Sequence, residues 1–299
     1  MSELPLDGAH RFGARLQKLM TERGQLCVGI DPHPALLSNW GLPDTASGAR
    51  EFALRILDSV AGLVPAIKPQ VALFERFGSA GFLVLEELLA ASRDAGVLSI
   101  ADAKRGDIGS TMAAYALAWL DSESTLAADA VTLSPYLGFE SLRPALDLAT
   151  DQGRGVFVLA LTSNPEGPSV QHVGASENDG AVAARIVRAA SEENHRELAG
   201  RTLAGETNGQ TLGSTGLVIG ATVGESVRKL GLDLAGVSGP ILAPGLGAQG
   251  ATGADLRVVF DSAYPQVLAT SSRGIAEAGP DRNAIAAATR ATLEELTAQ

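Results

Sequence analysis

Two acids and a lysine stand close together in residues 102–108, Asp-Ala-Lys-Arg-Gly-Asp-Ile. They follow residues 97–101, whose apolar character is typical of a buried β-strand. Side chains two positions apart on a strand point to the same face, so Asp102 and Lys104 are expected side by side, roughly 6 to 7 Å apart at the backbone. Asp107 would lie beyond the strand, in the next loop or at the start of the next helix. The cluster predicts a site that holds one substrate at a strand end.

A single Asp-x-Lys pair has an ordinary alternative, because surface ion pairs are common and weak. A second strand-like segment, residues 63–68, also ends in a lysine, Lys68, which is followed by Pro69. Two lysines and two acids at strand ends therefore favour an alternating charge cluster over an isolated pair.

The length and composition of the chain predict one large α/β domain that spans residues 1–299. The 299 residues are enough for a full core, and the 45% of hydrophobic residues are spread evenly. No apolar run approaches the roughly 20 residues that span a bilayer, and residues 1–13 lack the features of a secretory signal. We expect a cytoplasmic protein with no membrane partner.

The cysteine and histidine content gives little support for a metal site. The single cysteine, Cys27, excludes an internal disulfide and a cysteine metal cluster, and its apolar surroundings predict a buried core position. The four histidines are His10, His33, His172 and His195, and no two are four residues apart. We expect no metal ion.

A formal net charge of −11 argues against a nucleic-acid partner, since the charge term that dominates such binding would be repulsive. An anionic small molecule remains compatible if a local positive pocket receives it. Candidate cations for that pocket each follow an apolar stretch: Lys68, Lys104, Arg105 and Arg273.

Eight short apolar runs recur along the chain, and helix-like stretches lie between most of them. The runs are residues 26–30, 64–67, 97–101, 130–133, 156–161, 217–221, 240–242 and 266–269. The helix-like stretches are residues 48–62, 80–95, 111–119, 140–150, 178–198 and 253–262. This alternation predicts a parallel sheet covered by helices, and eight repeats favour closure as a (β/α)8 TIM barrel. An open doubly wound sheet remains the alternative.

Residues with polar side chains, together with a Pro-Gly pair, lie where the predicted strands end, which is where such barrels build their active sites. They are Asp31, Lys68, Asp102, Lys104, Ser134, Thr162, Ser163, Thr222, Pro244, Gly245, Ser272 and Arg273. Residues 162–180 are rich in Ser, Asn, Pro and Gly, which predicts a long loop that could act as a lid. Residues 199–216 precede the sixth strand, and we interpret them as a surface insertion without a chemical role.

Two loops after the last strands predict a phosphate site. Residues 244–250, Pro-Gly-Leu-Gly-Ala-Gln-Gly, follow the seventh strand, and Arg273 follows the eighth. Glycines let backbone N–H groups approach an anion, and an arginine can bind phosphate oxygens in a bidentate way. The pattern lacks the dinucleotide fingerprint, which follows the first strand of a βαβ unit. We therefore expect a phosphate monoester as ligand.

With these segments in this order, most of the chain closely resembles the orotidine 5′-monophosphate decarboxylase family, in its longer bacterial variety. The matching segments are residues 28–32 (Val-Gly-Ile-Asp-Pro), 68–70 (Lys-Pro-Gln), 102–109, 161–165 (Leu-Thr-Ser-Asn-Pro) and 244–250, with Arg273. The resemblance implies decarboxylation of orotidine 5′-monophosphate to uridine 5′-monophosphate, the last step of pyrimidine nucleotide synthesis, with no metal or organic cofactor.

The resemblance also implies roles for individual residues. Lys104 would donate the proton to C6, within a catalytic set made up of Lys104, Asp102, Asp107 and Lys68. The family is dimeric, so Asp107 would reach into the partner's site with Ile108 and Thr111 alongside. The remaining implied contacts are Asp31 and Lys68 to the ribose, Ser163 and Pro165 to the pyrimidine, and Gln249 and Arg273 to the phosphate.

Elementary chemistry is compatible with these roles. Loss of CO2 from C6 leaves a carbanion whose lone pair lies in the ring plane, so the ring cannot delocalise it. Lys104, flanked by Asp102 and Asp107, would supply a fixed positive charge there and then a proton.

Three other functions remain open. A related phosphosugar enzyme uses the same Asp-x-Lys-x-x-Asp element with a magnesium ion, but generally has an acid where this chain has Lys68. A Schiff-base aldolase activates its lysine by burial or by cationic neighbours, and Asp102 and Asp107 would act the other way. A catalytically silent nucleotide-binding protein would keep the pocket and lack turnover.

Overall fold

The protein, in a computed structural model that describes residues 10–178, 180–203, 212–247 and 250–298, is built around a closed barrel of eight parallel strands. The strands are β1 (Leu26–Ile30), β2 (Ala66–Pro69), β3 (Leu98–Arg105), β4 (Ala130–Leu133), β5 (Gly155–Leu161), β6 (Thr215–Ile219), β7 (Ile241–Pro244) and β8 (Val267–Ser271). β1 pairs in parallel with both β2 and β8, which closes the ring. The predicted TIM barrel is confirmed, and the open doubly wound sheet is wrong.

The strands follow the predicted apolar runs, and the informative difference is in β3. The predicted end at residue 101 is too early, because β3 continues to Arg105 and includes Asp102 and Lys104. The register between β3 and β4 shifts between Ala101 and Arg105. An irregularity of this kind re-aims side chains relative to simple alternation, so it alters how the charged residues leave the strand.

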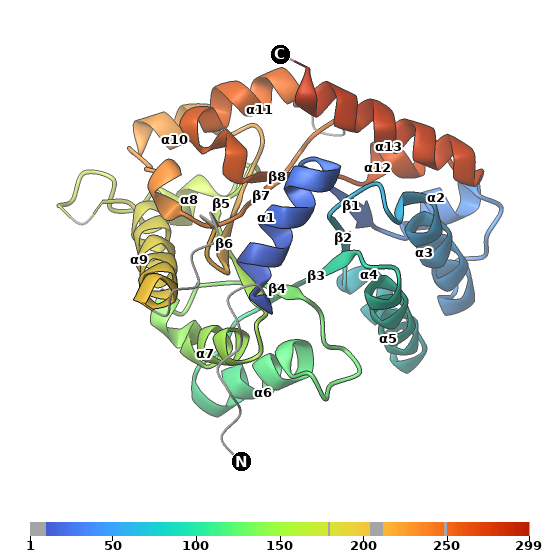
Figure 1. Ribbon diagram of the computed structural model, residues 1–299, viewed down its shortest axis with the longest axis horizontal. Coiled ribbons are helices and arrows are strands. Elements are labelled where there is room, and N and C mark those ends of the chain that lie inside the picture. The colour runs from blue at the N-terminus through green and yellow to red at the C-terminus, as the bar shows by residue number, and fades with distance from the viewer. Residues whose placement is uncertain (1–9, 179, 204–211, 248–249, 299) are drawn as a thin grey trace.

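Helices surround the barrel on its outer side, except for α1 (Phe12–Arg23), which lies across one end (Figure 1). The longer ones are α1, α3 (Ala46–Val60), α5 (Ser79–Asp94), α6 (Gly109–Leu120), α7 (Arg143–Asp151), α9 (Val182–Leu203), α11 (Gly253–Phe260) and α13 (Arg282–Thr297). Shorter helices are α2 (Pro34–Asn39), α4 (Ala72–Glu75), α8 (Pro168–Gln171), α10 (Gly224–Lys229) and α12 (Arg273–Ala276), with 3-10 turns η2 (Phe139–Leu142), η3 (Ala235–Val237) and η4 (Asp261–Gln266). All six predicted helical stretches overlap helices, and among the longer helices α1 and α13 are additional.

The segment predicted as an insertion, residues 199–216, is only partly one. Residues 199–203 extend α9, and residues 215 and 216 begin β6. Residues 204–211 lie outside the described part of the chain.

One helix closes one end of the barrel. α1 crosses the barrel axis in Figure 1, and its Phe12, Leu16 and Met20 pack into the apolar cluster inside the barrel. The ring of Phe12 meets that of Phe157 edge to face at 5.9 Å. A Cβ at Gly155 would overlap the Phe12 ring, so glycine is needed there for α1 to seat.

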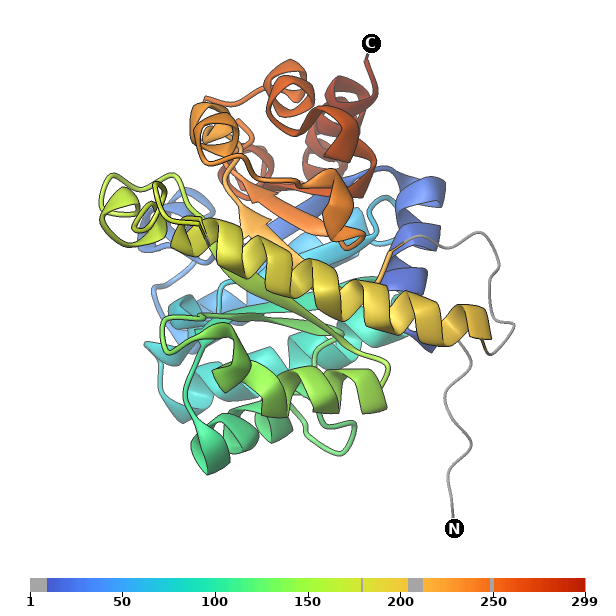
Figure 2. The ribbon, with the colours of Figure 1, turned by 90° about the vertical axis from the view of Figure 1, so that its left-hand side faces the viewer.

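Because α1 covers one end of the barrel, the interior of the barrel is open at the other end. The inner cluster includes residues at or near the first positions of the strands, such as Leu98 and Ala66, and it also buries Cys27 as predicted. α1 therefore covers the N-terminal ends of the strands. The C-terminal ends face the opposite side, where the segment that contains α8 lies (Figure 2).

Candidate active site

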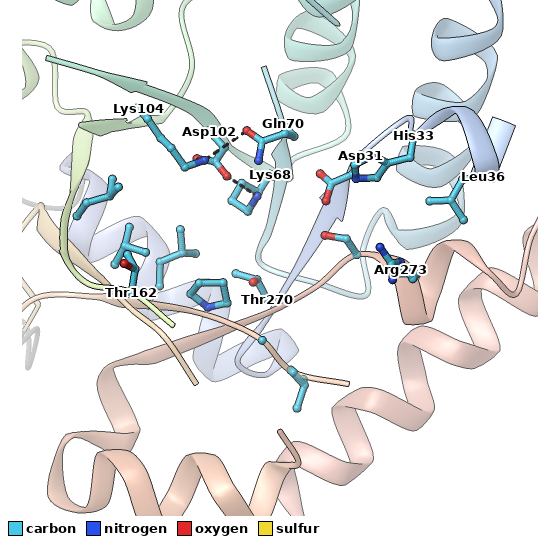
Figure 3. A pocket seen from close by; sticks show the side chains of 17 residues that line it. Asp31, His33, Leu36, Lys68, Gln70, Asp102, Lys104, Thr162, Thr270 and Arg273 are labelled. Atoms are coloured by element: carbon cyan, nitrogen blue, oxygen red, sulfur yellow. Dashed lines mark hydrogen bonds and ion pairs between the residues drawn. The ribbon is translucent and has the colours of Figure 1, made fainter. Parts of the chain in front are cut away.

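A cavity of about 410 Å3 opens at the C-terminal ends of the strands. Its lining includes Asp31 after β1, Lys68 on β2, Asp102 and Lys104 on β3, and Arg273 at the start of α12 (Figure 3). These residues come from four segments that are far apart in sequence, and the closed barrel brings them around one space. The other lining residues are His33, Leu36, Gln70, Leu159, Thr162, Val218, Leu242, Pro244, Gly245, Leu246, Thr270 and Ser272.

Two lysines bind the two oxygens of one carboxylate in this cavity. Lys68 Nζ lies 2.8 Å from Oδ2 of Asp102, and both side chains are buried. Lys104 Nζ lies 2.6 Å from Oδ1 of the same carboxylate, and its side chain is 45% exposed. Lys68 is thus held inside the barrel, while the amine of Lys104 can reach a bound ligand.

Thr132 on β4 fixes the geometry of this cluster. Its hydroxyl lies 3.0 Å from Oδ1 of Asp102, to which it can donate, and it accepts the backbone N–H of Lys104 at 2.9 Å. Lys104 has a φ of +48°, a conformation that non-glycine residues adopt at an energetic cost. The two hydrogen bonds of Thr132 hold the carboxylate and the strained residue in one arrangement.

The protonation states in the cluster are set by burial and by the opposite charges. Burial alone would lower the pKa of Lys68, but the carboxylates of Asp102 and Asp31 outweigh it and raise that pKa above the usual lysine value. Burial alone would raise the pKa of Asp102, but Lys68 and Lys104 outweigh it and hold that pKa well below the usual aspartate value. The Lys68 ammonium and the Asp102 carboxylate are therefore both ionised near neutral pH.

Asp31 offers a free acceptor to a ligand. Its Oδ1 is buried and makes no hydrogen bond with the described residues, and its carboxylate lies beside the cavity in Figure 3. Buried polar atoms are normally paired, so an unpaired one that lines a cavity suggests that a ligand donor pairs with it.

Arg273, a predicted phosphate contact, lies across the cavity from Lys104 (Figure 3). Arg273 is the first residue of α12, and its side chain makes no hydrogen bond or ion pair within the described residues. Gly245 and Ser272 line the same region. A Cβ at Gly29 on β1 would overlap the side chain of Ser272, so glycine there makes room for this loop. Gln249, the other predicted phosphate contact, lies outside the described residues.

The residues predicted to reach into a partner's site, Asp107, Ile108 and Thr111, do not line this cavity in the described chain. Asp107 is partly exposed after β3, and its Oδ1 accepts the N–H of Ile108 at 2.8 Å. Ile108 is 62% exposed at the N-cap of α6, and Thr111 is exposed in the first turn. They form an accessible surface beside the site.

The predicted lid begins at Thr162, which lines the cavity. Gln171 in α8 accepts the backbone N–H of Thr162 at 3.0 Å and donates to its hydroxyl at 2.7 Å. These contacts close residues 162–171 into a loop. Ser163 and Pro165 are exposed on that loop and do not line the cavity within the described chain.

Arg105 was expected to contribute positive charge to the pocket, and this is wrong. Its guanidinium pairs with Glu75 and lies 5.7 Å from the ring centre of Tyr115, outside the cavity lining. The register shift between β3 and β4 and the conformation of Lys104 send consecutive side chains in different directions. Ser134 and Thr222, two other predicted strand-end residues, are also absent from the described lining.

Sequence reasoning missed two polar groups of the cluster. Thr132 and Gln70 both contact Lys104, the latter with Oε1 at 3.4 Å from Nζ. The position of Gln70 directly after Lys68-Pro69, at the end of a predicted strand, could have indicated that it lies in the site. Thr132 had a weaker one, as a polar residue within an apolar strand.

No three His, Cys, Asp or Glu side chains among the described residues gather in a way that could hold a metal ion. None of the described helices combines the length and apolar character needed to cross a membrane.

Comparisons with known proteins agree with the geometry. The model of the orotidine 5′-phosphate decarboxylase / HUMPS family matches residues 24–288. The orotidine 5′-phosphate decarboxylase of Salinispora tropica is 52% identical over 287 residues, which cover 96% of this chain and 97% of the relative. That of Streptomyces coelicolor is 51% identical over 289 residues, covering 96% and 98%. A crystal structure from Streptomyces avermitilis superposes with a TM-score of 0.87 at 48% identity, covering 99% of this chain and 97% of that one.

Proposed function

The chain belongs to the orotidine 5′-phosphate decarboxylase / HUMPS family, and on this premise we propose that it decarboxylates orotidine 5′-monophosphate to uridine 5′-monophosphate. The observation that carries the proposal is the buried Lys68–Asp102 pair with Lys104 on the second carboxylate oxygen. It supports decarboxylation over the magnesium-dependent phosphosugar reaction, because Lys68 occupies the strand end where those relatives generally have an acid.

The cavity suggests how the nucleotide lies. Arg273 stands across the cavity from Lys104 in Figure 3, so a phosphate at Arg273 would direct the base towards Lys104. The free Oδ1 of Asp31 lies between these ends and is suited to a ribose hydroxyl. Binding energy from the remote phosphate can then be used to orient the base for reaction.

Lys104 is the proposed catalytic acid. As CO2 leaves C6, negative charge develops in the ring plane, and the ammonium of Lys104 would stabilise it and then protonate C6. The bonds to Asp102 and Gln70 restrict where the amine lies. Lys68 is fixed by its own bond to Asp102 and is suited to orient that carboxylate and to contact the ribose.

The site is proposed to be shared between two subunits of a homodimer. Asp107, Ile108 and Thr111 lie beside the cavity opening without lining it, and Ile108 presents a large apolar side chain to solvent. A second copy that covers this surface would bury Ile108 and could receive Asp107 next to its own Lys104. Ser163 and Pro165 would approach the pyrimidine when the loop of residues 162–171 folds over the ligand.

The remaining expectations stay predictions. They are the single-domain organisation of residues 1–299, the cytoplasmic location, the absence of a cofactor and the phosphate contact of Gln249.

The activity is tested by the change in absorbance as orotidine 5′-monophosphate is consumed by the purified chain in excess chelator. We expect full turnover, with uridine 5′-monophosphate identified as the product. Loss of activity in chelator would favour the magnesium-dependent alternative. Nucleotide binding without product would favour the catalytically silent alternative, and a reductant-trapped adduct on Lys68 or Lys104 would favour the aldolase.

A further inference from the structure

A second cavity, of about 750 Å3, lies at the N-terminal end of the barrel beside α1. It is lined by Leu98, the first residue of β3, whereas Asp102 and Lys104 near the other end of that strand line the candidate active site. The two cavities share no lining residue. The function proposed above makes no use of the second cavity.

The lining of this cavity is rich in cations, and we call it the basic cavity. The cations are Arg15, Lys18, Arg23, Arg93 and Arg154, against the two carboxylates Glu22 and Asp129. This local excess of positive charge stands out in a chain whose formal net charge is −11.

The acids in the lining neutralise little of this charge. Asp129 pairs with Arg15 at 2.6 Å through Oδ1, and its Oδ2 accepts the backbone N–H of Ser99 at 2.9 Å. Lys18, Arg23, Arg93 and Arg154 make no ion pair with any described residue.

Three of the arginines have a structural role that accounts for part of their donors. Arg23, Arg93 and Arg154 lie at or just after the C-terminal ends of helices, where cations are favourable. Each uses its Nη1 on main-chain carbonyls: Arg23 on Gly96 at 2.9 Å and on Val64 at 3.3 Å, Arg93 on Ala127 at 2.8 Å and Arg154 on Ala128 at 2.5 Å. The other guanidinium nitrogens of these three arginines have no acceptor within the described chain. Nε of Arg154 is buried without a hydrogen-bond partner.

The cations also act on one another. Burial lowers the pKa of Arg154, and the neighbouring charges of Arg15 and Arg93 lower it further, against the opposing effect of Asp129. Like charges gathered at one place with unused donors are stabilised when an anion binds between them.

We propose that the basic cavity binds a phosphate-bearing small molecule at a site separate from the candidate active site. Guanidinium groups match phosphate oxygens in geometry and form charge-assisted hydrogen bonds with them. The volume lies within the range of about 300 to 1,000 Å3 that is typical of small-molecule pockets.

Calorimetric titration of the full-length chain with inorganic pyrophosphate, and separately with adenosine triphosphate, tests this site. The combined variant Lys18→Ala/Arg93→Gln removes two exposed cations of the basic cavity. Arg290→Gln, on an exposed face of α13, removes a charge outside both cavities and serves as the control for each single substitution. Arg273→Ala removes the proposed phosphate contact of the active site.

We expect saturable binding of at least one probe, with an affinity at least tenfold weaker in the Lys18→Ala/Arg93→Gln variant. The Arg290→Gln and Arg273→Ala variants should keep at least one binding event of wild-type affinity. If the combined variant does not fold, as judged by circular dichroism, the two single substitutions are measured instead.

Three results would overturn the proposal. They are no saturable binding of either probe at millimolar concentration, unchanged affinity in the basic-cavity variants, and loss of all binding in Arg273→Ala. These results do not depend on whether the chain decarboxylates a nucleotide, because the binding of the probes is measured directly.

Discussion

The backbone N–H of Lys104 donates to Oγ1 of Thr132 at 2.9 Å, and this contact holds Lys104 at a φ of +48°. The same hydroxyl lies 3.0 Å from Oδ1 of Asp102. A single buried oxygen on β4 thus connects the proposed proton donor to the carboxylate that binds it. Thr132 does not line the cavity within the described chain, so it acts as a positioning residue.

Replacing Thr132 by valine keeps the side-chain shape and removes the hydroxyl. Hydrogen bonds to charged groups contribute about 1.5 to 3 kcal/mol, so kcat should fall about ten- to a hundredfold if the loss is felt in the transition state. KM should change little, because Arg273 and Asp31 are untouched. Steady-state kinetics test this, with Thr132→Ser expected to restore most of the rate. Equal kcat in Thr132→Val and in the unsubstituted chain would remove the positioning role.

Replacing Lys104 by alanine should abolish turnover while nucleotide binding stays measurable. The substitution removes both the cation beside C6 and the proposed proton, but leaves the phosphate contacts in place. Turnover and the binding of uridine 5′-monophosphate are measured on the same preparation, with Lys229→Ala, an exposed lysine on α10, as control. Substantial residual decarboxylation would mean that another group donates the proton.

Mixing Asp107→Ala subunits with Lys104→Ala subunits tests the shared site. Half of the dimers in a random mixture are hybrids with one intact site each, so we expect about a quarter of the unsubstituted activity. Each variant alone should remain nearly inactive. Heterodimers proven by mass spectrometry that recover no activity would contradict a site built from two subunits.

Replacing Asp102 by asparagine should destabilise the fold as well as the site. Lys68 is 6% exposed, and removing one partner of a buried pair costs about 3 to 5 kcal/mol in the free energy of unfolding. Urea unfolding at a fixed protein concentration measures this, with Asp151→Asn, an exposed aspartate, as control. An unchanged free energy of unfolding would contradict the ionic role of the pair.

The pH dependence of that loss has a definite sign. The pKa of Asp102 is lower in the folded chain than its unfolded value of 3.8, so its contribution to stability is present above that value. The contribution is lost as the pH falls through the folded pKa. The difference in stability between the unsubstituted chain and Asp102→Asn should therefore narrow in acid, and a gap that widens instead would contradict this assignment.

Replacing Arg273 by alanine should weaken the binding of nucleoside monophosphates about ten- to a hundredfold through loss of a charge-assisted contact. Binding of the corresponding nucleoside, which has no phosphate, should be unaffected. Competition titrations with both ligands separate these effects, and Arg290→Ala is the control. Equal weakening for both ligands would place Arg273 away from the phosphate.

Some features of the fold and of the candidate site can be predicted from local sequence patterns. The apolar runs of residues 26–30 and 130–133 coincide with β1 and β4, because a buried parallel strand is apolar on both faces. The C-terminal ends of the parallel strands meet at one rim of the barrel, so Asp102, Lys104 and Arg273 are expected there. Asp102 and Lys104 contact each other as expected, although the register shift between β3 and β4 means that simple strand alternation does not describe their geometry.

The sequence by itself therefore determined the barrel, the rim that carries the polar residues and the charged types gathered there, since these depend on the order of residues along each strand. Only the tertiary structure decided that Lys68 pairs with Asp102, that Thr132 supports Lys104, and that cations from three separate segments surround the basic cavity. Those contacts join residues far apart in the chain, and they depend on strand register, on a strained φ and on how α1 seats in the barrel. No local pattern of residues carries that information.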